Sequence, residues 1–250
     1  MKLHPVEVLG REEHGRHVLL RYRWTGEAPR PGQFVMARPQ NHAGLDPFLP
    51  RPLFAHDHEG ETVSLLFEVR GRGTALLAGE DAGLLVSAPL GRGFGTEGSG
   101  PVALIGGGVW VSPLKLLSRR LKGSGVGHDV YLEVPEGAPE AYAEFLRTRY
   151  ESAALIETGG ASDPPRAVLD RVGELSGYAT LYVSGTAETL QAAKHAAEGV
   201  VSAQLALRER MACANGSCYG CAVPVWEAGE KTYRRACVEG PVFRAEALAW

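Results

Sequence analysis

The sequence predicts a multidomain fold of the β plus α/β class, with an antiparallel barrel, a parallel-sheet α/β domain and a small C-terminal domain built around cysteines. Three observations lead to this prediction. The N-terminal part holds short β-type runs separated by Gly and Pro clusters, and after Pro101 strand-like and helix-like runs alternate. All four cysteines then fall between residues 213 and 237. We place the domains at residues 1–97, 98–203 and 204–250.

In the N-terminal part, regular short strands with turn residues between them indicate an antiparallel barrel or sandwich. The expected strands are Val18–Trp24, Gln33–Ala37, Thr62–Val69 and Leu84–Ala88. The glycine-rich segment Gly95–Gly100 marks the boundary with the next part.

The middle part alternates apolar strands with helices, which indicates βαβ units and a parallel sheet. The expected strands are Val102–Ile105, Asp129–Val134, Ala153–Glu157 and Thr180–Val183. The expected helices are Leu114–Leu121, Glu140–Tyr150, Glu188–Ala197 and a last one, Ala203–Met211, that leads into the cysteines.

Composition and charge exclude several classes of function. Lys and Arg total 26 against 29 for Asp and Glu, so the net charge of −3 offers no basic surface for nucleic acid. The opening MKLHPVEVLGREEHG has no apolar run of signal-peptide length, and no stretch of the chain approaches the length of a membrane span. We therefore expect a cytoplasmic protein with no nucleic-acid and no membrane partner.

The cysteines follow the pattern Cys213-x4-Cys218-x2-Cys221, with Cys237 after 15 more residues. This is the plant-type spacing of a [2Fe–2S] cluster, in which a tight loop holds one side and a distant cysteine closes the other. Small residues such as Gly216 let backbone N–H groups approach the sulfurs. A structural zinc site or four buried free thiols are the alternatives, although zinc ribbons more often contain two Cys-x2-Cys pairs.

Two strand ends of the middle part carry residues suited to a dinucleotide. Gly106, Gly107 and Gly108 follow the first strand, and such a turn lets backbone N–H groups face a diphosphate. The sequence does not match G-x-G-x-x-G, and a plain tight turn is the alternative. Ser184 and Gly185 end a later parallel strand, where open α/β sheets bind ligands.

Two motifs of the barrel contain residues that an ordinary turn does not need. In LPRPLF, Arg51 is a cation of the type that binds a diphosphate through two N–H groups, and Pro52 stiffens the strand that carries it. In EVRGRGTALL, Gly73 and Thr74 offer a close backbone approach and a hydroxyl. The alternatives are a surface arginine and a β-turn.

The order of these motifs, RPLF, GRGT, PLGRGF, LIGGGVWVSPL, VSG and the cysteine segment with VEGPVF, resembles one family over nearly the whole chain. It is that of the electron-transfer subunits of the NAD-linked dihydroorotate dehydrogenases, within the ferredoxin–NADP reductase superfamily. The resemblance implies an FAD-binding barrel, an NAD-binding α/β domain and a [2Fe–2S] domain. It also implies an FMN-containing catalytic partner, in a heterotetramer with two copies of each chain, acting in pyrimidine biosynthesis.

The same resemblance implies that electrons pass from the partner's FMN through the cluster and FAD to NAD, so that the cofactors carry the chemistry and no general acid or base is expected. The FAD positions it implies are Arg51, Pro52, Leu53, Phe54, Leu66, Phe67, Glu68, Gly73 and Thr74. The chain departs from the family at Phe54, usually Ser or Thr, at Glu68, usually Arg, and at Ser184-Gly185-Thr186, usually a Cys-Gly-Pro type motif. Because a carboxylate repels a diphosphate, we expect weaker FAD binding than in relatives.

Two other functions fit the motifs. One is the flavin and iron–sulfur subunit of a related NAD(P)H-dependent complex, such as a sulfhydrogenase or a ferredoxin–NADP oxidoreductase. The other is an accessory chain that keeps the cluster and has lost a nucleotide site.

Overall fold

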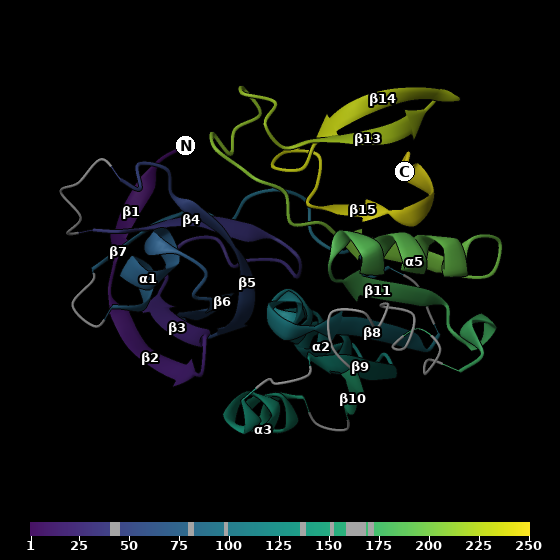
Figure 1. The fold of residues 1–250 in the computed structure, drawn as a ribbon, viewed down its shortest axis with the longest axis horizontal. Helices are drawn as coiled ribbons and strands as arrows, with labels where there is room; N and C mark the ends of the chain where they lie inside the picture. Colours follow the sequence, from purple (N-terminus) through teal and green to yellow (C-terminus); the bar gives the residue numbers. More distant parts are fainter. Residues whose placement is uncertain are drawn as a thin grey trace.

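The computed structural model describes residues 1–40, 46–79, 83–97, 100–135, 139–150, 153–158, 169 and 173–250. Its strands form a seven-stranded sheet, a six-stranded sheet and a two-stranded hairpin. Figure 1 shows the seven-stranded sheet curled on one side, the six-stranded sheet beside it and the hairpin above. The predicted class, an antiparallel sheet followed by a parallel α/β sheet, is confirmed.

The seven-stranded sheet is antiparallel and runs β1-β7-β4-β5-β6-β3-β2, so its two edge strands are consecutive in the chain. Its strands are β1 (Leu3–Val6), β2 (Val8–His14), β3 (His17–Arg23), β4 (Phe34–Pro39), β5 (Arg51–Glu59), β6 (Thr62–Glu68) and β7 (Leu84–Ser87). The four predicted barrel strands are confirmed as β3, β4, β6 and β7. Strand β2 is not predicted, because its polar run GREEH hides the alternation of a half-buried strand.

A short helix, α1 (Arg72–Ala78), follows β6 where the sequence alone left only a turn. Its first turn is held by the Thr74 hydroxyl, which accepts from the backbone N–H of Arg70 at 3.0 Å and of Gly71 at 3.3 Å. The helix packs Leu77 into the barrel core.

The six-stranded sheet runs β10-β9-β8-β11-β12-β15, parallel except for β15. Its strands are β8 (Val102–Gly107), β9 (His128–Pro135), β10 (Ala154–Thr158), β11 (Thr180–Ser184), β12 (Ser202–Ala206) and β15 (Val242–Arg244). The helices that cover it are α2 (Leu114–Gly123), α3 (Glu140–Arg149) and α5 (Ala187–Ala197). One core holds α2 and α3 and the other holds α5, so helices cover both faces and the predicted elements up to Ala197 are confirmed.

The helix predicted at Ala203–Met211 is wrong, because residues 202–206 form strand β12. Ala203 and Leu205 are buried between β11 and β15, and this packing overrides the helix propensity of Ala, Gln and Leu. Strand β12 crosses the boundary that we placed after residue 203, and the division into domains stays a prediction. Residues 98 and 99 of the boundary segment lie outside the described residues.

The C-terminal part joins the six-stranded sheet instead of standing apart from it. It contains the hairpin β13 (Ala222–Glu227) and β14 (Glu230–Arg235), then β15 and a 3₁₀ turn, η3 (Ala245–Ala247). Val223 and Val225 on the inner face of the hairpin share one core with Leu205 of β12. No helix in the described ranges is both long and apolar enough to cross a membrane.

The barrel and the α/β sheet meet through polar and aromatic contacts. Asp57 of β5 accepts two hydrogen bonds from Arg119 of α2, both at 2.7 Å. His17 of β3 stacks on Tyr142 of α3 with ring centroids 3.7 Å apart.

His56 of β5 is 2% exposed, and its Nδ1 lies 3.0 Å from the Ser112 carbonyl oxygen. A carbonyl only accepts, so Nδ1 carries the hydrogen and Nε2 is a buried acceptor without a partner among the described residues.

We predict that acid loosens this interface through His56. Burial lowers the pKa of His56 from 6.5 to about 4, so below pH 6.5 the unfolded chain binds a proton that the folded chain does not. Stability is therefore lost as the pH falls from 6.5 towards 4, and a shift of this size costs about 2 kcal/mol of unfolding free energy by pH 5. Denaturant unfolding of wild type and His56→Asn at pH 7 and pH 5 measures this.

Asn can still donate to the Ser112 carbonyl and cannot titrate, so the His56→Asn variant should lose the part of the pH dependence that His56 contributes. Burial also lowers the pKa of His17 at the same interface, so His17 should keep a remaining dependence of the same sign. The matched control is His58→Asn in the same strand, which should keep the wild-type dependence. Equal pH dependence in wild type and His56→Asn would contradict the prediction.

Candidate functional site

The four cysteines come together at one end of the C-terminal hairpin. Cys213 and Cys218 lie in the loop between β12 and β13, Cys221 directly precedes β13, and Cys237 follows β14. The pairing of Ala222 with Arg235 brings the last two side by side, since the Ala236 N–H donates to the Cys221 carbonyl at 3.0 Å. Cys221 and Cys237 are buried, whereas Cys218 is exposed.

The thiols are arranged as two pairs. The Cys218 N–H donates to the Cys213 sulfur at 3.4 Å, and the N–H groups of Asn215 and Cys218 lower the pKa of Cys213 to about 6. In the other pair, burial and then the adjacent Cys221 thiol raise the pKa of Cys237 to about 12. A positively charged group beside Cys237 would therefore be needed to keep its thiolate.

This arrangement fits a cluster of two irons. In such a rhomb each iron takes two of the four thiolates, whereas one zinc ion needs all four around a single point. In the described part of the chain no three His, Cys, Asp or Glu side chains lie close enough to hold one ion. Ala214, Gly216 and Tyr219 adopt positive φ angles of 50°, 84° and 56°, which is how this short loop turns its N–H groups towards sulfur.

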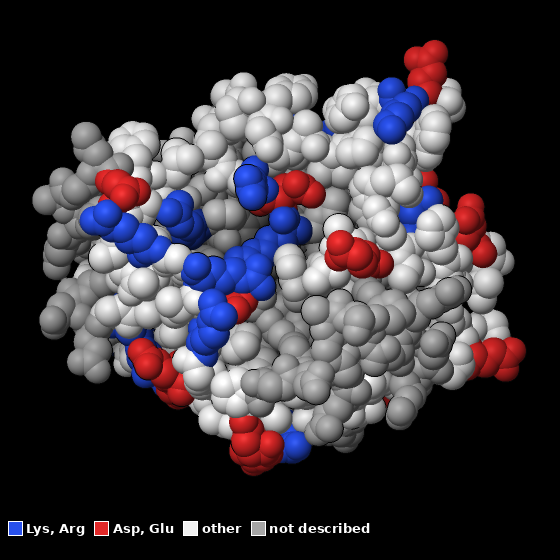
Figure 2. Space-filling model, viewed as in Figure 1, with Lys and Arg blue, Asp and Glu red and all other residues white. Residues whose placement is uncertain are grey.

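A cavity of about 410 Å³ opens where the barrel, the α/β sheet and the segment ahead of the cysteines meet. Figure 2 shows Lys and Arg side chains gathered on this face across the middle of the molecule. The lining residues come from the start of β5 and the residue before it, the turn from β6 into α1, the turn η1 (Gly108–Val111) and the segment before Cys213. They are Pro50, Arg51, Pro52, Leu53, Arg70, Thr74, Trp110, Arg208, Glu209, Arg210 and Met211.

The cavity carries positive charge that is only partly neutralised. Arg70 pairs with Glu68 at 2.5 Å, but no ion pair to a carboxylate is seen for Arg51, Arg208 or Arg210 within the described ranges. The Arg208 guanidinium lies 5.3 Å from the centre of the Trp110 ring. Burial, and then the charge of Arg70, lowers the pKa of Arg208. An anionic ligand such as a diphosphate would relieve this repulsion.

The structure brings together the two barrel motifs found in the sequence. A Cβ on Gly73 would lie 2.3 Å from Nε of Arg51, so only glycine allows the guanidinium to lie against the start of α1. Arg51 also donates to the Leu49 carbonyl at 2.8 Å, which fixes its direction. Thr74 lines the cavity, although its hydroxyl already bonds the backbone of α1.

The other predicted FAD positions lie differently. Leu66 and Phe67 of β6 are buried, at 2% and 1% exposed, so their side chains belong to the cores. Phe54 packs against two cores and is not among the residues that line the cavity in the described part. Glu68 lies between Arg70 and Arg16, at 2.5 and 3.8 Å, so its charge is largely offset by arginines.

The two predicted strand ends of the dinucleotide site are neighbours, because β8 and β11 pair in parallel. Gly106 and Gly107 end β8 instead of forming the turn, and their missing side chains leave room for Leu114 and Glu133. Gly108 alone takes a positive φ, of 48°. Ser184 is fully buried, and its hydroxyl has no partner among the described residues. Gly185 packs against Thr189 of α5, where a Cβ would lie 2.6 Å away.

Sequence reasoning missed several residues of the cavity: Arg70, Trp110, Arg208, Glu209, Arg210 and Met211. The available signal was the run ERM just ahead of Cys213, which continues into the loop of the cysteines. Burial raises the pKa of Glu209 within this run.

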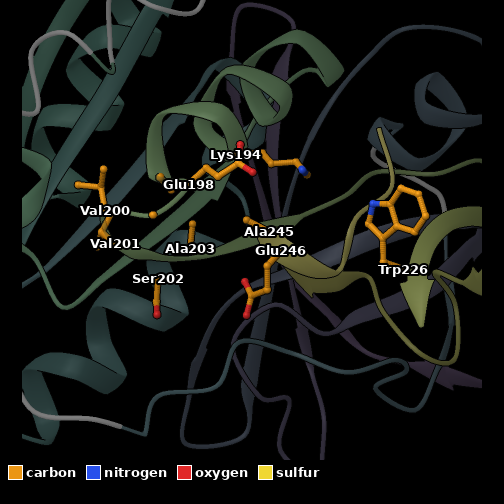
Figure 3. Close-up of a pocket in the computed structure, with 11 residues that line it drawn as sticks. Lys194, Glu198, Val200, Val201, Ser202, Ala203, Trp226, Ala245 and Glu246 are labelled. Atoms are coloured by element: carbon orange, nitrogen blue, oxygen red, sulfur yellow. The ribbon is translucent and has the colours of Figure 1, made fainter. Parts of the chain in front are cut away.

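A separate cavity of about 440 Å³ lies at the start of β12, whereas the arginine-lined cavity follows its end. Figure 3 shows Trp226 of β13 on one side of it, and Lys194 of α5 and Glu198, which directly follows α5, on the other. It contains no thiol and no residue of the predicted cofactor sites.

Both the C-terminal cysteine segment and the chain as a whole are similar to known proteins. A family model described as the iron–sulfur cluster binding domain of dihydroorotate dehydrogenase B matches residues 208–249. The electron-transfer subunit of NAD-linked dihydroorotate dehydrogenase B from Caldanaerobacter subterraneus is 33% identical over 91% of this chain and 90% of its own length. The subunit of the same name from Geobacillus kaustophilus is 34% identical over 88% of this chain and 86% of its own length.

Solved structures share the fold. The structure of an NADH-dependent reduced ferredoxin–NADP oxidoreductase contains a chain with a TM-score of 0.79 and 23% identity, covering 99% of this chain and 90% of that one. Phthalate dioxygenase reductase gives a TM-score of 0.61 at 12% identity, covering 94% of this chain and 77% of that one.

We predict that the charge of the cavity sets the affinity for FAD. Removing the guanidinium with Arg51→Ala should weaken binding about tenfold or more, since hydrogen bonds to charged groups contribute about 1.5–3 kcal/mol. Glu68→Gln should tighten binding, because it releases Arg70 from its carboxylate partner. Titration of the apoprotein with FAD, followed by flavin fluorescence, measures both.

Arg72→Ala is the matched control, because Arg72 lies nearby but pairs with Asp46 outside the cavity lining. It should leave the dissociation constant unchanged. FAD binding that is indifferent to Arg51→Ala would show that the diphosphate lies elsewhere.

Proposed function

The chain belongs to the family of the electron-transfer subunits of NAD-linked dihydroorotate dehydrogenase B, and on this premise we propose how its residues serve that role. It takes electrons from a catalytic chain that holds FMN and passes them through a [2Fe–2S] cluster and FAD to NAD. The chain is thus an oxidoreductase subunit of pyrimidine biosynthesis and does not itself oxidise dihydroorotate. It works in the cytoplasm, where its free thiols stay reduced until they bind iron.

One observation carries the proposal: the segment that lines the arginine-lined cavity runs directly into the cysteine loop. Met211 lines the cavity and Cys213 follows two residues later, so a flavin in the cavity and a cluster on the cysteines are held by the same short segment. A cluster transfers one electron at a time and a flavin takes up two, so this pairing converts single electrons into the hydride that NAD accepts. The protein sets the distance and orientation of the two groups.

The cluster would be held by Cys213, Cys218, Cys221 and Cys237. Backbone N–H groups that point at sulfur, such as those of Cys218 and Gly220 at 3.4 Å, stabilise added negative charge. The loop therefore favours a reduced cluster.

FAD would lie with its diphosphate on Arg51 and the other arginines of the cavity, against the backbone at Gly73 and Thr74. Pro52 and Leu53 line the same wall. The remaining FAD positions belong to β5 and β6 and would support the site through their backbone and through core packing. They are Phe54, Leu66, Phe67 and Glu68. Trp110, held by Arg208, offers an aromatic face to a planar ring.

NAD would bind across the ends of β8 and β11, at Gly106–Gly108 and Ser184–Gly185. Parallel α/β sheets bind nucleotides at the carboxyl ends of their strands. The buried Ser184 hydroxyl has a free hydrogen-bonding capacity in the described structure, which supports a polar ligand there. Because η1 continues directly from Gly108 to Trp110, this site adjoins the arginine-lined cavity.

The catalytic partner would dock on the exposed side of the cysteine loop, in an assembly with two copies of each chain. Cys218 is exposed, and the neighbouring Tyr219 and Tyr233 are 55% and 57% exposed. Large exposed aromatic side chains are typical of protein interfaces. An accessory chain that had lost its nucleotide site would have no need for three arginines that pair with no carboxylate among the described residues, which argues against that alternative.

Reconstitution with the FMN-containing catalytic chain tests the proposal. We expect NAD reduction driven by dihydroorotate only when both chains are present. Cys218→Ser should abolish this activity, whereas oxidation of NADH by the isolated variant with an artificial dye should persist through the flavin. Ser217→Ala, next to the ligand, is the matched control and should retain both activities. Oxidation of dihydroorotate by the isolated chain would refute the assignment.

A further inference from the structure

Arg235, the last residue of β14, touches the cysteine loop at two points. Its Nη1 donates to the Gly216 carbonyl at 3.3 Å. The guanidinium carbon also lies 5.1 Å from the centre of the Tyr219 ring. Both contacts fall within the loop that carries Cys213, Cys218 and Cys221.

The same side chain is bound to the turn that carries Cys237. Glu239 accepts from the Arg235 backbone N–H at 2.7 Å and from Nε at 3.1 Å, and its other oxygen accepts from Nη2. Cys237 lies halfway between these two residues in the chain. The Arg235 guanidinium therefore bridges the two segments that contribute cysteines.

The packing at this bridge is tight. Gly216 has a φ of 84°, and a Cβ there would lie 3.0 Å from both Nη1 of Arg235 and Cγ2 of Val238. The glycine thus serves the close approach of the guanidinium as well as the turn of the loop.

We propose that Arg235 and Glu239 are a positioning pair that holds the three-cysteine loop against the Cys237 turn and sets the reduction potential of the cluster bound between them. The proposal rests on the proposed function, since it takes a [2Fe–2S] cluster as the occupant of these cysteines. Arg235 brings a positive charge towards the site and Glu239 neutralises it.

The charges of Arg235 and Glu239 would change the reduction potential of the cluster in opposite directions, which a simple structural brace would not do. Reduction adds negative charge to the cluster, so a lone carboxylate nearby disfavours reduction and a lone guanidinium favours it. Arg235→Gln leaves Glu239 unpaired and should lower the midpoint potential. Glu239→Gln leaves Arg235 unpaired and should raise it. Loss of a merely structural brace would move both variants in the same direction.

The experiment is a redox titration of the anaerobically purified holoprotein, followed by the EPR signal of the reduced cluster. A second measurement is the rate at which a chelator removes iron, followed by absorbance. Removal of a partner outside the ligand set weakens metal sites about 10–100-fold, so Arg235→Gln should lose iron at least several-fold faster. Arg235→Lys keeps the charge but not the two-point contact, so it should lose iron faster with a potential close to that of the wild type.

Arg234→Gln is the matched control, because Arg234 is adjacent but its ion-pair partner is Glu227 at the other end of the hairpin, and its charge acts on Glu239 more weakly than that of Arg235. It should leave iron loss unchanged and shift the potential much less than Arg235→Gln. Potentials that stay unchanged, or shift in the same direction in Arg235→Gln and Glu239→Gln, would overturn the positioning pair while leaving the cluster assignment intact. A wild-type protein without iron and sulfide would overturn the proposed function itself, and the pair with it.

Discussion

Positive charge concentrated where the barrel, the parallel sheet and the cysteine segment meet is the constraint on which the rest of this structure depends. Arg51, Arg70, Arg208 and Arg210 come from distant parts of the chain and line one cavity, with Glu68 as the carboxylate that pairs with Arg70. Such an arrangement costs free energy through repulsion and desolvation unless an anion occupies it. The fold therefore concentrates repulsion between arginines at the place where a diphosphate ligand would be bound.

The cysteine site needs positive charge instead, because Glu239 neutralises the guanidinium of Arg235 beside it. Burial raises the pKa of the Cys237 thiol, whereas N–H groups around Cys213 already favour its thiolate. Iron would supply the charge that the buried pair lacks. The segment from Arg208 to Cys213 connects the two sites, since the cation–π contact of Arg208 with Trp110 fixes one end and the cysteine loop fixes the other. Flavin and cluster would thus be positioned by one piece of backbone.

The sequence alone predicted what depends on local pattern. The alternating strands and helices from Val102 to Ala197 and the cysteine spacing are local signals, and the structure contains the corresponding elements. It did not predict β12, where pairing with two neighbouring strands overrides helix propensity. The arginine-lined cavity was predicted only in part, through Arg51, Pro52, Leu53 and Thr74. Arg208 and Arg210 lie about 160 residues after Arg51 in the chain, so only the tertiary fold brings them to the cavity. The environment of Glu68 was predictable only in part, because its closer partner Arg70 is two residues away, whereas Arg16 comes from β2–β3, about 50 residues earlier in the chain.

The central claim is that flavin and cluster are electronically coupled within this one chain. Anaerobic titration of the isolated holoprotein with NADH, followed by flavin absorbance and by EPR, tests it most directly. The account predicts that NADH bleaches the flavin and also produces the signal of the reduced cluster, with about three electrons taken up per chain, two by FAD and one by the cluster. A flavin that bleaches fully in excess NADH while the cluster stays oxidised would contradict it.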